Sequence, residues 1–144
     1  MKLVLDNKNL AEDFFEETRL LGIMAPIKDY QLCWCLNSIM GMDFRINNDI
    51  EIQLNKKNRN YFFAVYEFCE PTNSLFHYVY NNRFEGEYLL PEFKHLDFLW
   101  LMKGDIVNEE TLQQTINGIK QINGVQLVVE LTNEKIRNKE HLVF

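Results

Sequence analysis

The chain has 144 residues, a formal net charge of −6 at pH 7, 47% hydrophobic residues and 13% aromatic residues. So large an apolar fraction excludes an intrinsically disordered protein, and the acidic balance argues against a protein that holds nucleic acid through phosphate contacts. No apolar run approaches the ~20 residues of a membrane helix, and the N-terminus lacks the apolar core of a secretory signal. We therefore expect a single domain, residues 1–144, located in the cytoplasm and without a membrane partner.

The three cysteines are predicted to be reduced. An odd number of cysteines without a secretory signal argues against a disulfide framework, and Cys33 and Cys35 are too close to cross-link in regular structure. The spacing of these residues to Cys69 and His77 matches none of the usual zinc patterns. We therefore predict thiols that pack as small hydrophobic residues, and neither a metal site nor a cofactor.

The first part of the chain predicts two strands and two helical segments. In chain order, we expect a strand at Lys2–Leu5, a helical turn capped by Asn9 with Glu12 in the capping-box position, a strand at Arg19–Ala25 and a helix at Asp29–Met40. The helix has apolar residues at helical spacing, and Gly41 stands where a helix-ending residue belongs.

The middle of the chain predicts a run of strands. We expect an outer strand at Asp49–Leu54, a central strand at Tyr61–Phe68, and strands at Leu75–Tyr80 and Phe84–Leu90 joined by a tight turn at Asn81-Asn82. The outer strand alternates between polar and apolar residues, whereas the central strand is apolar on both faces and should therefore be buried on both.

The last third repeats the strand–helix–strand order of the first. Asp97–Lys103 is apolar on both faces, Asn108 can cap the helix that follows, and Val125–Leu131 is the returning strand. The apolar stripe of that helix consists of Leu112, Ile116, Ile119 and Ile122. Two such units around a central meander predict an α+β fold: a mostly antiparallel sheet with two main helices on one face, arranged as a ferredoxin-like core with extra strands.

A short motif joins two of the predicted strands, and its positions are Leu90, Pro91, Glu92, Leu96, Asp97 and Phe98. Pro91 fixes φ and pushes the residue before it towards extended geometry. Glu92 can begin a single helical turn and accept its N–H groups, and Asp97 can accept backbone N–H groups where the chain re-enters the sheet. We favour this interpretation, in which the motif is a shaped corner between strands.

The alternative interpretation makes Glu92, His95 and Asp97 the acid–base group of a small enzyme. A histidine and a carboxylate two positions apart on a strand share a face, and the carboxylate can orient the imidazole. Such a group also needs a nucleophile, a metal or a substrate pocket, and the sequence contains no motif for any of these.

The motif resembles the signature of the bacterial IPExxxVDY family, with Leu90 for isoleucine, Leu96 for valine and Phe98 for tyrosine. The segment LLGIMAPIKDYQLCWCLNSIMG is similar to that family's N-terminal strand and Asp-Tyr-bearing helix, and RNKEHLVF is similar to its C-terminus. The resemblance therefore covers most of the chain. It implies a small single-domain protein of Bacteroidetes with no activity to carry over, and any role of the family's tyrosine hydroxyl would be lost at Phe98.

Two further groups of residues are candidates for binding. Lys56, Lys57 and Arg59 form a basic loop before a run of aromatic residues, which could hold RNA, although the net charge favours a solvated loop and makes nucleic acid an unexpected partner. Tyr30 and Trp34 lie one turn apart beside the apolar stripe of the predicted helix, where an exposed aromatic pair can anchor a protein partner.

We therefore expect a non-enzymatic binding or assembly module for an unidentified ligand, with the small enzyme and an RNA-associated protein as alternatives. His95 of the motif is a further candidate binding residue. A second copy of the chain is one expected partner, because a strand such as Ile50–Leu54 or Leu127–Leu131 at an open sheet edge favours twofold assembly.

Overall fold

The computed structural model describes residues 10–144. The strand expected at Lys2–Leu5 and the cap expected at Asn9 lie outside these residues. The helices are α2 (Asp29–Met40) and α3 (Glu109–Lys120), preceded by a helical turn at residues 10–14. The strands are β1 (Arg19–Met24), β2 (Arg45–Ile46), β3 (Ile52–Lys56), β4 (Arg59–Phe63), β5 (Val65–Cys69), β6 (Phe76–Asn81), β7 (Arg83–Phe84), β8 (Glu87–Tyr88), β9 (Phe98–Lys103) and β10 (Leu127–Glu130).

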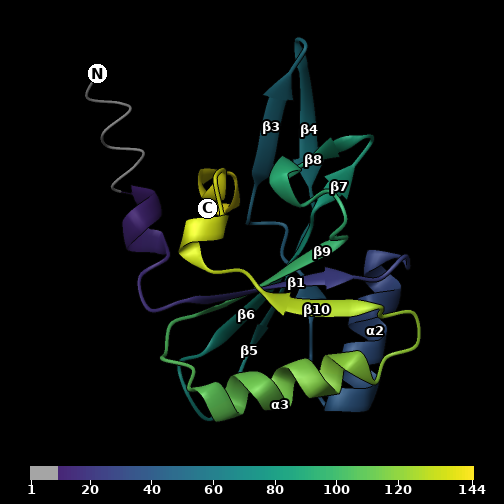
Figure 1. The fold of residues 1–144 in the computed structure, drawn as a ribbon, viewed down its shortest axis with the longest axis vertical. Helices are drawn as coiled ribbons and strands as arrows, with labels where there is room; N and C mark the ends of the chain where they lie inside the picture. Colours follow the sequence, from purple (N-terminus) through teal and green to yellow (C-terminus); the bar gives the residue numbers. More distant parts are fainter. Residues whose placement is uncertain (1–9) are drawn as a thin grey trace.

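Six of these strands form one sheet in the order β10-β1-β9-β6-β5-β2, and every neighbouring pair is antiparallel. The order β10-β1-β9-β6, with α2 after β1 and α3 after β9, is that of a ferredoxin-like β-α-β-β-α-β core. Strands β5 and β2 extend this core at one edge. The fold is therefore the expected α+β type with extra strands (Figure 1).

Both helices cover the same face of the sheet (Figure 1). Their apolar stripes are buried, and in α3 the stripe is the expected one, with Leu112, Ile116 and Ile119 against the sheet. Asn108 caps α3 by accepting a hydrogen bond of 2.8 Å from the backbone N–H of Thr111. Helix α2 ends at Gly41, whose φ of 66° is the left-handed geometry that stops a helix.

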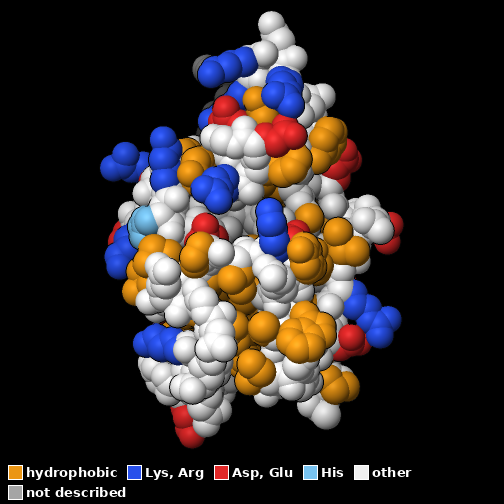
Figure 2. Space-filling view, turned by 90° about the vertical axis from the view of Figure 1, so that its right-hand side faces the viewer, with side chains coloured by type: hydrophobic (Ala, Val, Ile, Leu, Met, Phe, Trp, Pro, Cys, Tyr) orange, Lys and Arg blue, Asp and Glu red, His pale blue; other side chains and the backbone are white. Residues whose placement is uncertain are grey.

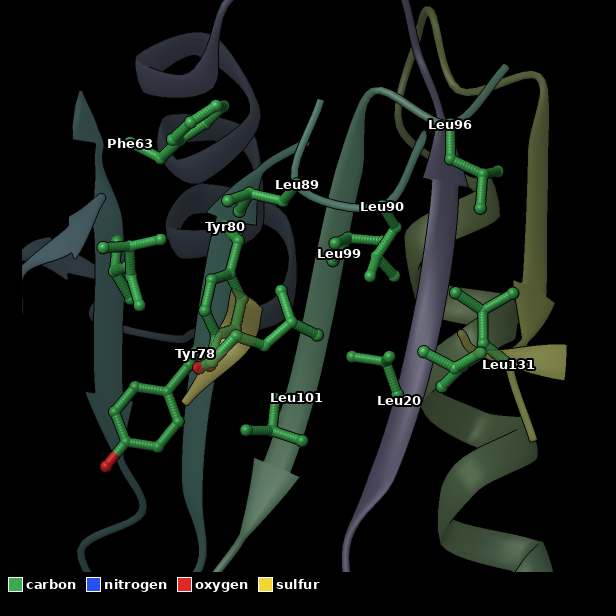
Figure 3. Packing of buried hydrophobic residues seen from close by; sticks show 14 of the residues in the cluster. Leu20, Phe63, Tyr78, Tyr80, Leu89, Leu90, Leu96, Leu99, Leu101 and Leu131 are labelled. Carbon is green, nitrogen blue, oxygen red and sulfur yellow. The ribbon is translucent and has the colours of Figure 1, made fainter. Parts of the chain in front are cut away.

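The opposite face of the sheet is covered by the β3–β4 hairpin and by the C-terminal segment. Leu99 and Leu101 of β9 point to this side together with Tyr80 of β6 and Leu20 of β1 (Figure 3). The alternate residues of β9 are buried under the helices instead. Both faces of β9 are therefore covered, which explains why its sequence is apolar on both faces.

The meander departs from the sequence prediction at four places. Tyr61–Phe68 is not one strand: it divides at Ala64, so that β4 pairs with β3 in a hairpin that rises from the sheet, while β5 stays in the sheet (Figure 1). The expected outer strand begins later, at Ile52. Phe84–Leu90 is not one strand either, since β7 and β8 form a small separate pair that turns at Glu85 and Gly86, both with positive φ.

Asn81-Asn82 is not a tight turn, which is the fourth difference. Asn81 ends β6, and the backbone N–H of Asn82 donates to the carbonyl of Asp97 over 2.9 Å. The side chain of Asn82 is completely buried. A buried amide must find hydrogen-bond partners inside the protein, and those partners belong to the motif.

Candidate functional site

The motif forms the corner between β8 and β9, and the single helical turn that the sequence predicts at Glu92 is a 3-10 turn over Pro91–Phe93. Leu90 and Leu96 are buried on the hairpin side of the sheet (Figure 3). Gly22 of β1 leaves room for this corner, because a Cβ atom there would lie 2.3 Å from Cδ1 of Leu96. The apolar positions of the motif are therefore core positions.

Asn82 holds both ends of this corner. Its Nδ2 donates to the carbonyls of Phe93 over 3.0 Å and of Leu96 over 2.9 Å, and its Oδ1 accepts from the N–H of Leu90 over 2.9 Å. These three backbone groups have no sheet partner in the bend, so the amide satisfies them in place of a strand. Sequence analysis missed this role because an Asn pair between apolar runs is equally typical of a turn.

Glu92 clamps the C-terminal segment, a long-range role that the sequence did not predict, and its own backbone N–H in the turn also helps to lower the pKa of its carboxyl. Its carboxylate accepts from the backbone N–H of Arg137 over 2.5 Å, and from the backbone N–H and the Nδ2 of Asn138 over 2.9 Å each. Partial burial raises the pKa of the Glu92 carboxyl, but the hydrogen bonds from Asn138 and Arg137 outweigh it, so that the pKa is lowered overall. The carboxylate is therefore ionised and structural at neutral pH.

Asp97 takes the position that the sequence predicts for it. Its Oδ2 accepts from the backbone N–H of Ala25 over 2.8 Å, and its own N–H donates to the carbonyl of Ile23 over 2.8 Å. Asp97 thereby fastens the beginning of β9 to the end of β1.

The three residues of the enzyme alternative are engaged in different places. Glu92 binds the C-terminal segment and Asp97 binds the end of β1. His95 is exposed, with its ring at the edge of the Phe93 ring at a centroid distance of 6.4 Å. Within residues 10–144, no hydrogen bond joins any two of the three.

Asp97 and Phe98 also line a cleft of about 600 Å³, which we call the α2 cleft. Its other lining residues come from the β1–α2 connection, the first turn of α2, the end of β6, and strands β4 and β7. They are Pro26, Ile27, Lys28, Asp29, Gln31, Phe62, Ala64, Asn81, Arg83 and Phe84. The volume falls within the roughly 300–1,000 Å³ that is usual for ligand sites.

The carboxylates in the α2 cleft are held by the protein itself. Oδ2 of Asp29 accepts from the Tyr66 hydroxyl over 3.1 Å and from Nδ2 of Asn81 over 2.9 Å, and its Oδ1 accepts from the N–H of Tyr30. Burial raises the pKa of the Tyr66 hydroxyl, and the neighbouring Asp29 charge raises it further. Tyr66 therefore remains a hydrogen-bond donor to Asp29 at neutral pH.

Exposed aromatic side chains surround the α2 cleft. Phe62 and Phe84 line it and are 53% and 42% exposed. Tyr30 and Trp34 do not line it but lie on α2, whose Asp29 and Gln31 do, and they are 63% and 69% exposed, as expected for an aromatic pair outside the apolar stripe. Figure 2 looks onto the side where α2 and the β7–β8 pair lie, and it shows hydrophobic side chains spread over this side among charged ones.

The sequence pattern indicates an exposed aromatic pair at Tyr30 and Trp34 but not at Phe62 and Phe84. It predicts Phe62 in a central strand, where both faces are buried. In the hairpin only one face is covered, so that Tyr61 and Phe63 are buried and Phe62 between them is exposed.

The basic loop is largely neutralised by the β7–β8 pair. Nζ of Lys56 lies 3.3 Å from Glu87, and the guanidinium of Arg59 lies 2.7 Å from Glu85. The same guanidinium lies over the Tyr61 ring at 5.2 Å from its centroid. Lys57 is exposed and forms no ion pair among the described residues, so the loop presents one free positive charge of its three to a phosphate backbone.

A buried polar chain under α2 was not predicted. Nδ1 of His77 accepts from the indole N–H of Trp100 over 3.0 Å, and its Nε2 donates to Glu70 over 2.6 Å. Burial lowers the pKa of His77 more strongly than the Glu70 carboxylate raises it, so the imidazole is neutral at pH 7. Since both of its nitrogens are occupied, His77 is a structural connector and is not free to act as a base.

The three thiols differ in exposure. Cys33 is buried in α2, where burial raises the pKa of its thiol to about 12. Cys35 is half-buried, and Cys69 is exposed, so the prediction of a buried thiol is wrong for Cys69 because it lies at the end of strand β5. Over the described part of the chain, no group of three side chains could hold a metal ion and no helix is long and apolar enough to cross a membrane.

Comparisons of this chain with protein-family models, with curated proteins and with solved structures find no match. The assignment of the site therefore depends on its geometry.

Proposed function

We propose that this protein is a non-enzymatic binding module that docks a segment of another protein in the α2 cleft. The observation that carries this proposal is the pair of exposed aromatic side chains that line the cleft, Phe62 and Phe84, together with exposed Tyr30 and Trp34 on α2, the helix that contributes Asp29 and Gln31 to the lining. Exposed aromatic groups beside a concave surface are typical of the anchors of protein interfaces. Here they come from α2, β4 and β7, so the fold, rather than one segment, presents them together.

The enzyme alternative has weaker support. A catalytic acid or base needs access to a reacting group, whereas Glu92 is occupied by the C-terminal segment and His95 lies apart from both carboxylates. An RNA-associated role also has weaker support, because Glu85 and Glu87 neutralise Arg59 and Lys56.

We further propose that the chain is a divergent bacterial member of the IPExxxVDY family and acts in the cytoplasm. Support for the family comes from the motif, whose apolar positions are buried and whose two acids each make a specific long-range contact. A structure of a family member tests this: its signature acids should contact the segments equivalent to Ala25 and Arg137, and a different pairing would contradict it.

Twofold self-association is a separate prediction that concerns another surface. Of the two strands expected at an open edge, β10 is an edge strand of the main sheet, and β3, within Ile50–Leu54, lies in the two-stranded hairpin, where it pairs with β4 on one side only. Light scattering at micromolar concentration should report a dimer if β10 pairs with its copy, and a monomer would contradict this.

Capture of partners from a cell lysate, followed by binding of the purified partner, tests the docking function. The variant Trp34→Ala/Phe62→Ala should lose the partner that the parent protein captures. Ile106→Ala is the matched control, because Ile106 is 69% exposed but lies beyond the opposite end of β9 from the α2 cleft. It should retain the partner.

The purified partner should bind the parent protein and the control with equal affinity, and the double variant at least about tenfold more weakly, as expected for loss of an aromatic anchor. Equal binding by all three proteins would contradict the proposal. Partner binding lost through misfolding is recognised from the circular dichroism spectrum and the urea midpoint of each variant.

A further inference from the structure

The hydrogen-bond donors and acceptors of the α2 cleft indicate what kind of ligand it binds. This inference rests on the docking function proposed above. The apolar lining comes from Pro26, Ile27, Phe62, Phe84 and Phe98. Such a lining accepts an aromatic or branched aliphatic side chain, since burying one side chain of this kind contributes roughly 1.5–3 kcal/mol.

Both carboxylates of the cleft already have protein donors. Asp29 accepts three hydrogen bonds, and Asp97 accepts one from the N–H of Ala25. Asn81 donates its Nδ2 to Asp29. Both carboxylates are half-buried and bound to protein donors, so they offer less to a cationic ligand than their charges alone would indicate.

The donors of the cleft, by contrast, are free. Lys28 and Arg83 are exposed, and neither forms an ion pair with any residue of the described chain. The Oε1 of Gln31 accepts from the N–H of Lys28 over 2.9 Å, which leaves its amide Nε2 as a third donor. Three uncommitted donors, two of them cationic, favour an acceptor that carries negative charge.

We propose that the α2 cleft binds a peptide segment of a partner protein in which an aromatic or branched apolar side chain stands next to an acidic residue. The apolar side chain enters between Phe62 and Phe84, and the carboxylate lies against the exposed cations Lys28 and Arg83. The peptide backbone acceptors provide further partners for the amide of Gln31. A basic segment is disfavoured, since it would meet the two cations before it reached the occupied carboxylates.

Four capped tetrapeptides test this inference by titration against the ¹⁵N-labelled full chain, observed by NMR. The probe is acetyl-Gly-Phe-Glu-Gly-amide, and its relatives replace Glu with Gln, Glu with Lys, or Phe with Ala. The probe should shift the amide signals of the cleft, from Ile27 to Gln31 and from Asn81 to Phe84, in a saturable way. The Gln peptide should bind roughly twofold to fivefold more weakly, which is the effect of one exposed ion pair, and the Ala peptide should not bind measurably.

Two variants of the protein sharpen the result. Arg83→Gln should lower the affinity for the Glu peptide to that for the Gln peptide, and it should leave the affinity for the Gln peptide unchanged. Arg45→Gln is the control, because Arg45 is an exposed cation on β2 outside the α2 cleft, and it should leave both affinities unchanged. The preference for Glu over Gln should also decrease as salt is added, because exposed charges are screened.

Several outcomes overturn the inference. Tighter binding of the Lys peptide would assign the cleft to basic segments, and equal binding of the Glu and Gln peptides would remove the acidic requirement. Equal binding of 3-phenylpropionate and the Glu peptide would indicate a small-molecule site instead of a peptide site. If no peptide shifts the cleft signals although partner capture still depends on Trp34 and Phe62, this ligand class fails while the docking function remains. If capture is also independent of these two residues, both fail.

Discussion

The motif corner and the α2 cleft meet at Asp97 but differ in how their polar groups are used. In the corner, Asn82 bonds backbone groups of the bend and Glu92 bonds backbone groups of the C-terminal segment, so both side chains have partners inside the protein. In the cleft, Lys28 and Arg83 are exposed and without an ion pair in the described residues. A donor without a partner inside the protein can bond a ligand without first breaking an internal hydrogen bond. The free donors are therefore the better candidates for binding.

A sequence motif and a binding site need not coincide. The acids of Leu90–Phe98 are candidates for an acid–base group by sequence, yet their contacts are those of structural clamps. The residues around the cleft form no motif, because they come from segments that are far apart along the chain. Substitutions in the corner should therefore change stability, and substitutions at the cleft rim should change binding.

The largest effect is expected for Asn82→Ala. It leaves the N–H of Leu90 and the carbonyl of Leu96 buried without partners, while the carbonyl of Phe93 keeps the N–H of Leu96, so we expect the free energy of unfolding to fall by about 3–5 kcal/mol. Urea denaturation followed by circular dichroism measures it. Asn48→Ala at an exposed position is the control and should change the value by less than about 0.5 kcal/mol. Equal stability of the two variants would contradict the structural role of Asn82 in the corner.

Asp97→Ala should have the next largest effect, a loss of about 1–3 kcal/mol, because the N–H of Ala25 loses a charge-assisted partner. Asp97→Asn retains an acceptor of the same shape and should lose less. Chemical denaturation of both variants makes the comparison. If Asp97→Ala were as stable as the parent protein or more so, Asp97 would belong with the functional residues of the cleft, since removal of a functional acid often leaves stability unchanged or improved.

A smaller effect concerns pH and the buried chain of Glu70, His77 and Trp100. The pKa of His77 is lowered in the folded protein by burial, so the unfolded chain binds a proton more readily and stability should fall as the pH drops below the ordinary value of about 6.5. Burial raises the pKa of Glu70, but the bonds from His77 and Asn73 lower it overall, so a second loss of stability should follow below about pH 4.5.

Urea midpoints measured from pH 8 to pH 4 test this dependence. Replacing the exposed His95 with Gln should leave the loss between pH 7 and pH 5 unchanged, whereas His77→Gln should abolish most of it because no proton is then taken up at that position. A pH dependence of stability that survives in His77→Gln but disappears in His95→Gln would contradict this prediction, because proton uptake at His95 would then cause the loss.

The smallest effect on stability is expected for Trp34→Ala. The side chain is 69% exposed and packs little, so the free energy of unfolding should change by less than about 0.5 kcal/mol. A loss greater than about 1.5 kcal/mol in urea denaturation would show that Trp34 is part of the core packing. The contrast between the corner and the cleft rim would then no longer hold for this residue.

Much of the fold could be predicted from the sequence by itself. Helices α2 and α3, the cap at Asn108, the stop at Gly41 and the doubly buried strand β9 all follow from patterns within a few neighbouring residues. Helix caps and side-chain periodicities are local effects, since they act over one or two turns or between alternate residues of a strand. The α+β class followed from the order of these elements.

Only the tertiary structure decided the rest. Glu92 finds its partners 45 and 46 positions away, and Asn82 is a buried clamp instead of a turn residue because the corner folds back over it. The division of Tyr61–Phe68 at Ala64 turns Phe62 towards solvent, which completes the rim of the α2 cleft. Such features depend on which distant segments pack together, and hydrogen bonds and burial across those contacts leave no periodic trace in the local sequence.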